Sequence, residues 1–89
     1  MSVTIIVSFP VSDFDKWKAV FDSDVDNREA AGIHADAYKE LDDASRVHVI
    51  GTAPSREAFQ TFFSNPDLQQ RIQNSGVTGP PEIKILEKS

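Results

Sequence analysis

Hydrophobic and polar positions alternate along four short stretches of the chain, and each alternation predicts a β-strand. These stretches span residues 3–9, 33–41, 46–52 and 82–88. Between them lie two longer stretches, over residues 12–32 and 54–74, in which apolar residues recur at helical spacing. The pattern therefore predicts the order strand, helix, strand, strand, helix, strand.

The first helical stretch, from Ser12 to Gly32, is the clearest amphipathic segment and contains the only tryptophan. Ser12 is predicted to cap its first turn, with Asp15 completing a capping box, and Gly32 is predicted to end it. At about 100° per residue one narrow stripe carries four apolar residues and an arginine, which are Phe14, Trp17, Phe21, Val25 and Arg28. An arginine is therefore predicted to face the protein interior.

The second helical stretch is predicted to consist of two segments. Ser55 is expected to cap the first segment. Asn65 and Pro66 then interrupt the helix and start a new segment that runs to about Asn74. Residues 42–44 predict the turn of a hairpin that joins the second and third strands.

This order of elements has one common solution, because strand–helix–strand crossovers are right-handed. We expect an α+β protein of the ferredoxin-like βαββαβ class, in which residues 1–89 form a single domain. Its four-stranded antiparallel sheet would have the order 4-1-3-2, with both helices on one face. The predicted core comprises Val3, Ile5, Val7, Phe9, Ile33, Val47, Val49, Ile83 and Ile85 against Phe14, Trp17, Phe21, Phe59, Phe62 and Phe63.

Composition narrows the range of partners. Fourteen acidic and nine basic residues give a net charge of −5, without a basic stripe, which argues against nucleic acid and against anionic membrane surfaces. There is no cysteine, no basic leader and no apolar run of membrane-spanning length, so we expect a cytoplasmic protein. The two histidines lack a clustered acidic partner, and we therefore predict no metal site.

The sheet face away from the helices carries several residues that a monomer would expose to water. We predict that this face forms a homodimer, through Ile6, Tyr38, His48, Ile50 and Leu86. Tyr38 should lie opposite His48, and Glu40 opposite Arg46, if the hairpin turn centres on Asp43. The alternative is a solvated face with scattered apolar residues, which antiparallel sheets tolerate.

The chain resembles the dimeric α/β-barrel superfamily along essentially its whole length. Within it the chain is similar to small proteins related to antibiotic-biosynthesis monooxygenases, some of them labelled cyclases. The most specific segments are SDFDKWKAVFDS, REAAGI and SNPDLQQRIQNSGVTGPPEI. The resemblance implies a homodimer whose sheets face each other, with a small-molecule pocket between helices and sheet. It implies no single reaction, because the superfamily includes oxygenases, isomerases and haem enzymes.

Arg28 is the sharpest candidate for chemistry, since a guanidinium on an apolar stripe needs a partner. It would bind a carboxylate, enolate or other anion at the mouth of a pocket. The alternative is that the side chain reaches the end of the helix, where the last carbonyls and Asp24 satisfy its donors.

Two further groups of residues are candidates for a site. Tyr38, His34 and His48 share the outer sheet face and suit proton transfer, or else form a polar dimer interior. Aromatic residues could line a ligand pocket between helices and sheet, or simply form the core; they are Trp17, Phe21, Phe59, Phe62 and Phe63.

We therefore weigh two functions. The first is a homodimeric monooxygenase- or cyclase-like enzyme that uses neither metal nor cofactor and acts on a small apolar or anionic compound. Arg28 would bind the anion, Trp17 and Phe21 would form the wall together with Phe59 and Phe63, and Tyr38 or His48 would transfer protons. The second function is a non-catalytic dimer, either ligand-binding or structural.

Overall fold

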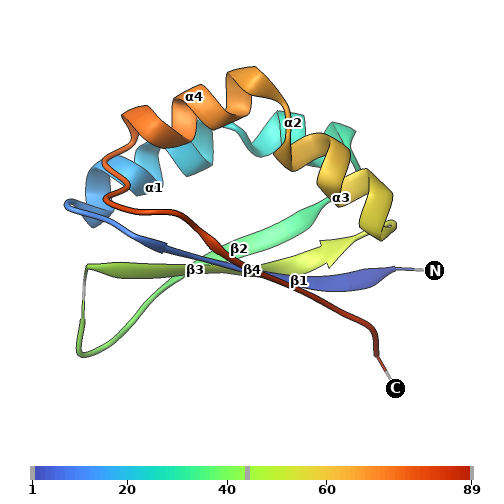
Figure 1. Cartoon of the computed structure of the whole chain (residues 1–89), viewed down its shortest axis with the longest axis horizontal. Coiled ribbons are helices and arrows are strands. Elements are labelled where there is room, and N and C mark those ends of the chain that lie inside the picture. The colour runs from blue at the N-terminus through green and yellow to red at the C-terminus, as the bar shows by residue number, and fades with distance from the viewer. Residues whose placement is uncertain (1, 44, 89) are drawn as a thin grey trace.

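The sheet has four antiparallel strands in the order β2-β3-β1-β4, as the sequence predicts (Figure 1). The computed structural model describes residues 2–43 and 45–88. Right-handed crossovers place the first and third strands at the centre of the sheet. The strands are β1 (Val3–Pro10), β2 (His34–Lys39), β3 (Arg46–Ala53) and β4 (Glu82–Leu86).

The strand register agrees with the predicted pairing in the hairpin. Tyr38 lies opposite His48, and the Glu40 N–H donates to the Arg46 carbonyl at 3.5 Å. The predicted turn includes Ala44, which lies outside the described residues. On the other side of β3, His48 lies opposite Ser8 of β1. His48 is therefore flanked by side chains from both neighbouring strands.

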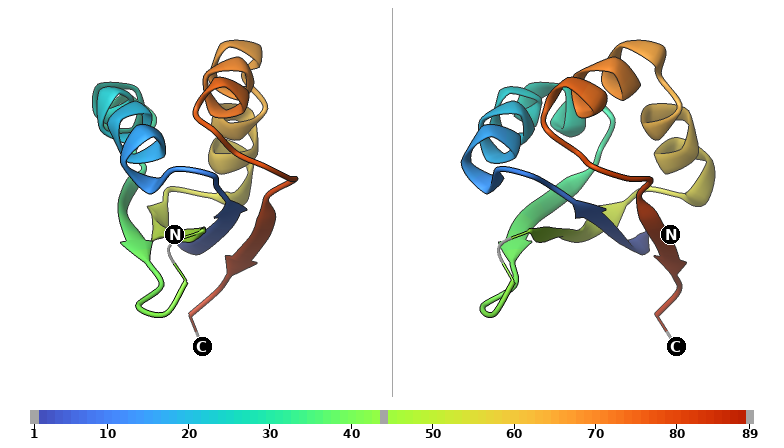
Figure 2. Two further views of the ribbon diagram at one scale, coloured as in Figure 1. Left: turned by 90° about the vertical axis from the view of Figure 1, so that its left-hand side faces the viewer. Right: turned by 60° about the vertical axis from the view of Figure 1, so that its left-hand side comes forward.

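All helices cover one face of the sheet, in two rows that stand side by side (Figure 2). The first row is α1 (Phe14–Ser23) followed by α2 (Val25–Ala30), and the second is α3 (Arg56–Phe63) followed by α4 (Pro66–Asn74). As predicted, Ser55 caps α3 and Asn65 caps α4 through their side chains. The first row differs from the prediction, because it consists of two helices where one continuous helix was expected.

The first row departs from the prediction at both ends of α1. Asp13 is the cap, because its carboxylate accepts from the N–H groups of residues 15 and 16, whereas Ser12 donates to the Gly76 carbonyl. At the other end, the Phe21 carbonyl accepts from the Asp24 N–H at 3.2 Å and from the Arg28 guanidinium at 2.6 Å. These bonds occupy the carbonyl that a continuous helix would pair with residue 25.

This break changes which side chains face inward. Val25, predicted on the buried stripe, is 42% exposed, whereas Arg28 stays buried at 8%. Ile83, predicted in the core, is 41% exposed because β4 is an edge strand. The other predicted core residues are buried or packed against the core. The buried hydrophobic residues are Ile5, Val7, Phe9, Val11, Trp17, Ile33, Val47, Val49, Ala53, Phe59 and Leu68.

The opposite face of the sheet carries no helix (Figure 1). Ile6 and Ile50 are directly opposed on it, and the exposed fractions of Tyr38, Ile50 and Leu86 are 50%, 38% and 44%. These apolar side chains lie where the sequence predicts them. One face of the sheet therefore builds the core, and the other presents a mixed apolar and polar surface.

Replacing the observed cap should destabilise the protein more than replacing the predicted one. We expect Asp13→Ala to lower the free energy of unfolding by about 1 kcal/mol, because two N–H groups of α1 lose their acceptor. Ser12→Ala removes one exposed hydrogen bond and should cost less. Urea denaturation of both variants measures the difference, and an equal or larger loss in Ser12→Ala would contradict the assignment.

Candidate functional site

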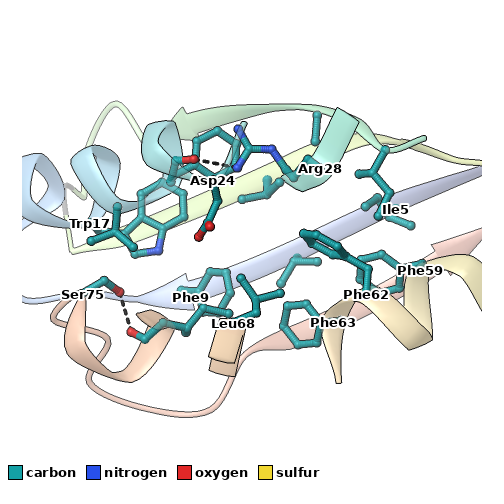
Figure 3. A pocket seen from close by; sticks show the side chains of 17 residues that line it. Ile5, Phe9, Trp17, Asp24, Arg28, Phe59, Phe62, Phe63, Leu68 and Ser75 are labelled. Carbon is teal, nitrogen blue, oxygen red and sulfur yellow. Dashed lines mark hydrogen bonds between the residues drawn. The ribbon is translucent and has the colours of Figure 1, made fainter. Parts of the chain in front are cut away.

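A cavity of about 70 Å³ lies between the helices and the sheet (Figure 3). Its floor comes from the central strands and its two walls from the two rows of helices. Apart from Asp24, Arg28 and Ser75, its lining is apolar. The lining residues are Ile5, Val7, Phe9, Trp17, Val20, Phe21, Asp24, Arg28, Ile33, Ala35, Val49, Phe59, Phe62, Phe63, Leu68, Ile72 and Ser75.

The five residues predicted to bind a ligand all line this cavity. Trp17, Phe21 and Arg28 come from the first row of helices, and Phe59 and Phe63 from the second. The Trp17 and Phe21 rings stack with centroids 5.2 Å apart, and the Phe59 and Phe63 rings with centroids 5.5 Å apart. The structure thus brings them together around one space, and their role in binding stays a prediction.

The Arg28 guanidinium is fixed by the first row of helices. It donates to the Phe21 carbonyl at 2.6 Å, and its carbon lies 3.7 Å from the centre of the Phe21 ring. Among the described residues this is the one hydrogen bond of the guanidinium. A main-chain carbonyl does accept from Arg28, but it belongs to Phe21 and not to the predicted end of the helix near Gly32. Other donors of Arg28 are still available for an oxygen atom from outside the protein.

Acidic residues surround Arg28. Burial lowers the pKa of Arg28 below its usual value, while the charge of Asp24, followed by those of Asp22, Glu29 and Asp36, opposes that effect. An arginine side chain nevertheless keeps its proton in proteins. The guanidinium is therefore a permanent cation within a locally acidic region.

Asp24, which the alternative interpretation of Arg28 made its partner, instead pairs with Arg71. Asp24 is 5% exposed. Its Oδ1 lies 3.0 Å from Nη2 of Arg71 in the second row, and its Oδ2 lies 3.1 Å from Nε of the same residue. Asn27 donates to the same carboxylate at 3.0 Å. The contact spans 47 residues, so helical spacing gives no signal for it. This two-pronged ion pair connects the two walls of the cavity.

Ser75 completes the polar lining, and sequence reasoning does not single it out. It is 1% exposed, and its hydroxyl donates to the Ile72 carbonyl in the last turn of α4 (Figure 3). That bond satisfies the hydroxyl donor, so Ser75 contributes a filled polar position. Arg28 is consequently a lining residue with unused hydrogen-bonding capacity, and so is Trp17, whose indole N–H has no hydrogen-bond partner among the described residues.

His48 belongs to a different cluster, on the outer face of the sheet. Its Nδ1 lies 2.7 Å from the Ser8 hydroxyl and its Nε2 lies 2.7 Å from Glu40. If Nε2 carries the proton and donates to Glu40, Nδ1 accepts from Ser8. Glu40 also lies 3.8 Å from Arg46. Sequence reasoning missed Ser8 and Glu40 as partners of His48, because their proximity depends on strand register.

The structure separates the two groups of candidate residues. Tyr38 and His48 share the outer face, and His34 lies on that face two pairs further along β2. Arg28 and the aromatic lining lie on the helix side of the sheet. Because side chains alternate across a strand, a proton carrier on the outer face cannot reach the cavity of its own chain. Arg28 and His48 thus do not form one site.

Two further features bear on function. Among residues 2–43 and 45–88, no three histidine, cysteine or acidic side chains gather in an arrangement that could hold a metal ion. In the same part of the chain, no helix combines the length and apolar character needed to cross a membrane.

Fold and cavity together define a ferredoxin-like α+β protein with an internal, mainly apolar space. Structural comparison finds the same fold in solved structures that include proteins described as antibiotic biosynthesis monooxygenases. The fold and the resemblance predicted from the sequence are thus confirmed. No family model and no curated protein sequence matches the chain.

Three solved structures illustrate this similarity. A Bordetella bronchiseptica protein assigned as an antibiotic biosynthesis monooxygenase has a TM-score of 0.84 at 15% identity, covering 99% of this chain and 97% of its own. A mutant of SnoaB, a cofactor-independent oxygenase from Streptomyces nogalater, scores 0.77 at 16% identity, with 98% and 92% covered. Rv0793 from Mycobacterium tuberculosis scores 0.74 at 18% identity, with 100% and 96% covered. At these identities the likeness establishes the fold.

The ion pair between the cavity walls should contribute measurably to stability. We expect Arg71→Met and Asp24→Asn each to lower the free energy of unfolding by about 2 kcal/mol. The double variant should lose less than the sum, with a coupling of about 1 to 3 kcal/mol, because Asp24 is almost fully buried.

The exposed pair of Lys18 and Asp22 is the matched control for this cycle. These side chains are 38% and 55% exposed and lie one helical turn apart. The same double-mutant cycle in urea should give a coupling of about 0.5 kcal/mol or less. Equal couplings for the two pairs would show that the ion pair between the walls has no special role.

Proposed function

We propose that this protein binds a small, mainly apolar compound in the cavity between helices and sheet, as a monooxygenase- or cyclase-like enzyme without a metal. The observation that carries the proposal is the cavity itself, with five predicted residues on its walls. A void of about 70 Å³ costs stability on the order of 1.5 kcal/mol relative to a filled core. A small domain tolerates that cost more readily if a ligand fills the space.

The chemistry of the lining limits what the cavity does to its ligand. Asp24 is held by Arg71 and Asn27, and Ser75 by a carbonyl, so neither is placed as a general base. The apolar walls exclude water and orient a compound against the guanidinium of Arg28. A reaction here would therefore depend on the compound's own reactivity, and the cofactor-independent oxygenase among the neighbours supports that reading.

The second candidate function is binding without turnover. It is favoured by the same observation, because the cavity residues include no free general acid or base among the described part of the chain. Oxygen uptake separates the two functions. An oxygenase consumes dissolved oxygen when it receives a compound that binds, whereas a carrier or sensor binds the compound and leaves oxygen unchanged.

We also infer that two copies associate through the outer face of the sheet. Two observations support this inference. Tyr38, Ile50 and Leu86 are exposed on this face, and Ile50 lies directly opposite Ile6 on the neighbouring strand. In such a homodimer, the cluster of Ser8, His48 and Glu40 lies at the interface, where Tyr38 and His48 are placed for proton transfer between copies. Ion pairs on the same face, such as that of Arg46 with Glu40, favour a defined orientation.

Binding in the cavity predicts that apolar compounds stabilise the protein. Small apolar compounds, ranging in size from chloroform to toluene, should raise the melting temperature of the wild-type protein, because ligands that bind only the folded state stabilise it. Phe63→Ala enlarges the cavity and should shift the preference toward toluene. Phe14→Ala is the control, because Phe14 packs on the core outside the cavity lining. A panel without effect on any variant would contradict the proposal.

The homodimer predicts different effects for two exposed isoleucines. Ile50 and Ile83 are 38% and 41% exposed, but Ile50 lies on the outer face and Ile83 on the helix side. Ile50→Asp should place an unpaired charge in the interface and yield monomers, while Ile83→Asp should remain dimeric. Light scattering measures both masses, and a wild-type mass of one chain would refute the dimer.

A further inference from the structure

The cavity shares part of its wall with an open cleft on the surface. This cleft has a volume of about 400 Å³ and lies between the first row of helices and β2. Three residues line both spaces, namely Phe21, Arg28 and Ala35. Charged and apolar residues both line the cleft, with Lys18, Asp22 and Asp36 beside Val25 and Ala37, whereas the cavity lining is mainly apolar. The two spaces thus share one layer of side chains.

This layer consists of side chains from α1, α2 and β2. The Phe21 ring and the Arg28 guanidinium stack at 3.7 Å, and neither is part of the sheet. The cavity is about half the volume of an engineered cavity of about 150 Å³ that admits benzene. A compound with more than a few carbon atoms therefore exceeds the cavity, and the cleft beyond this layer offers space for its remainder.

Charge determines what the outer end of such a compound can be. Lys18 is paired with Asp22 at 2.6 Å, and Asp24 is paired with Arg71. The cleft lining carries two cations, Lys18 and Arg28, against two carboxylates, Asp22 and Asp36, and has no excess of positive charge. The chain also carries a net charge of −5. An added carboxylate would thus find no excess positive charge in the cleft of a negatively charged chain, whereas an uncharged oxygen requires only the guanidinium donors.

The geometry points to a specific ligand class and entry route. The ligand is an uncharged amphiphile whose apolar tail passes between Phe21 and Arg28 into the cavity. Its carbonyl or ether oxygen, in the cleft, accepts a hydrogen bond from Arg28. This inference rests on the proposed function, since it assumes that the cavity is occupied, and it replaces the anion considered from the sequence with a neutral acceptor.

Three compounds with the same pentyl tail test the head group. They are 2-heptanone, with a neutral carbonyl; hexanoate, with a carboxylate; and pentane, with no oxygen. Trp17 is the only tryptophan, is 3% exposed and lines the cavity, so its indole N–H gives one NMR signal that reports on occupancy. We expect 2-heptanone to shift this signal at concentrations about tenfold below those required for hexanoate.

Two variants remove one cation each, the first inside the proposed site and the second outside it. Arg28→Met keeps a long side chain in the wall but removes the donors, and should weaken 2-heptanone about threefold to tenfold while leaving pentane unchanged. Lys16→Met is the control, because Lys16 is exposed, lines neither the cavity nor the cleft, and its replacement changes the net charge equally. It should leave the affinity for 2-heptanone unchanged.

The possible results separate the two proposals. Tighter binding of hexanoate than of 2-heptanone would overturn the neutral head group. An unchanged affinity for 2-heptanone in Arg28→Met would overturn the role of Arg28, and with pentane still bound the proposed cavity function would stand. Failure of all three compounds to shift the Trp17 signal would overturn both proposals.

Discussion

The carboxylate of Asp24 is the contact on which the arrangement of the helices depends. It lies at the junction of α1 and α2, is almost fully buried, and receives two guanidinium nitrogens of Arg71 from α4. A buried carboxylate without such a partner costs several kcal/mol, so the two rows of helices are constrained to lie at the distance of an ion pair. That distance sets the separation of the cavity walls.

The sheet could be predicted from the sequence because the signals that specify its strands are local. Alternation within each stretch, turn residues at 42–44 and the handedness of crossovers are sufficient to place all four strands and their order. The same local information placed the caps Ser55 and Asn65. It failed at Asp13, because Ser12 and Asp13 are both good caps and the choice depends on Ser12 binding Gly76, a residue 64 positions away.

The candidate site was predictable in part for the same reason. Helical spacing placed Trp17, Phe21 and Arg28 on one stripe, and all three line the cavity. It could not reveal the break at Asp24, since a straight helix is the default when no proline or glycine intervenes. The ion pair of Asp24 with Arg71 arises from packing between rows, and the cluster around His48 arises from the alignment of three strands.

The bond between Arg28 and the Phe21 carbonyl connects ligand binding to the backbone. The guanidinium occupies an acceptor that the peptide N–H of Val25 would use in an uninterrupted helix. The Asp24 N–H donates to the same carbonyl at 3.2 Å, so one oxygen atom holds both the end of α1 and the guanidinium that faces the cavity. A ligand that restrains Arg28 would therefore also restrain this junction, and occupancy would appear as slower amide exchange of Asp24 and its neighbours.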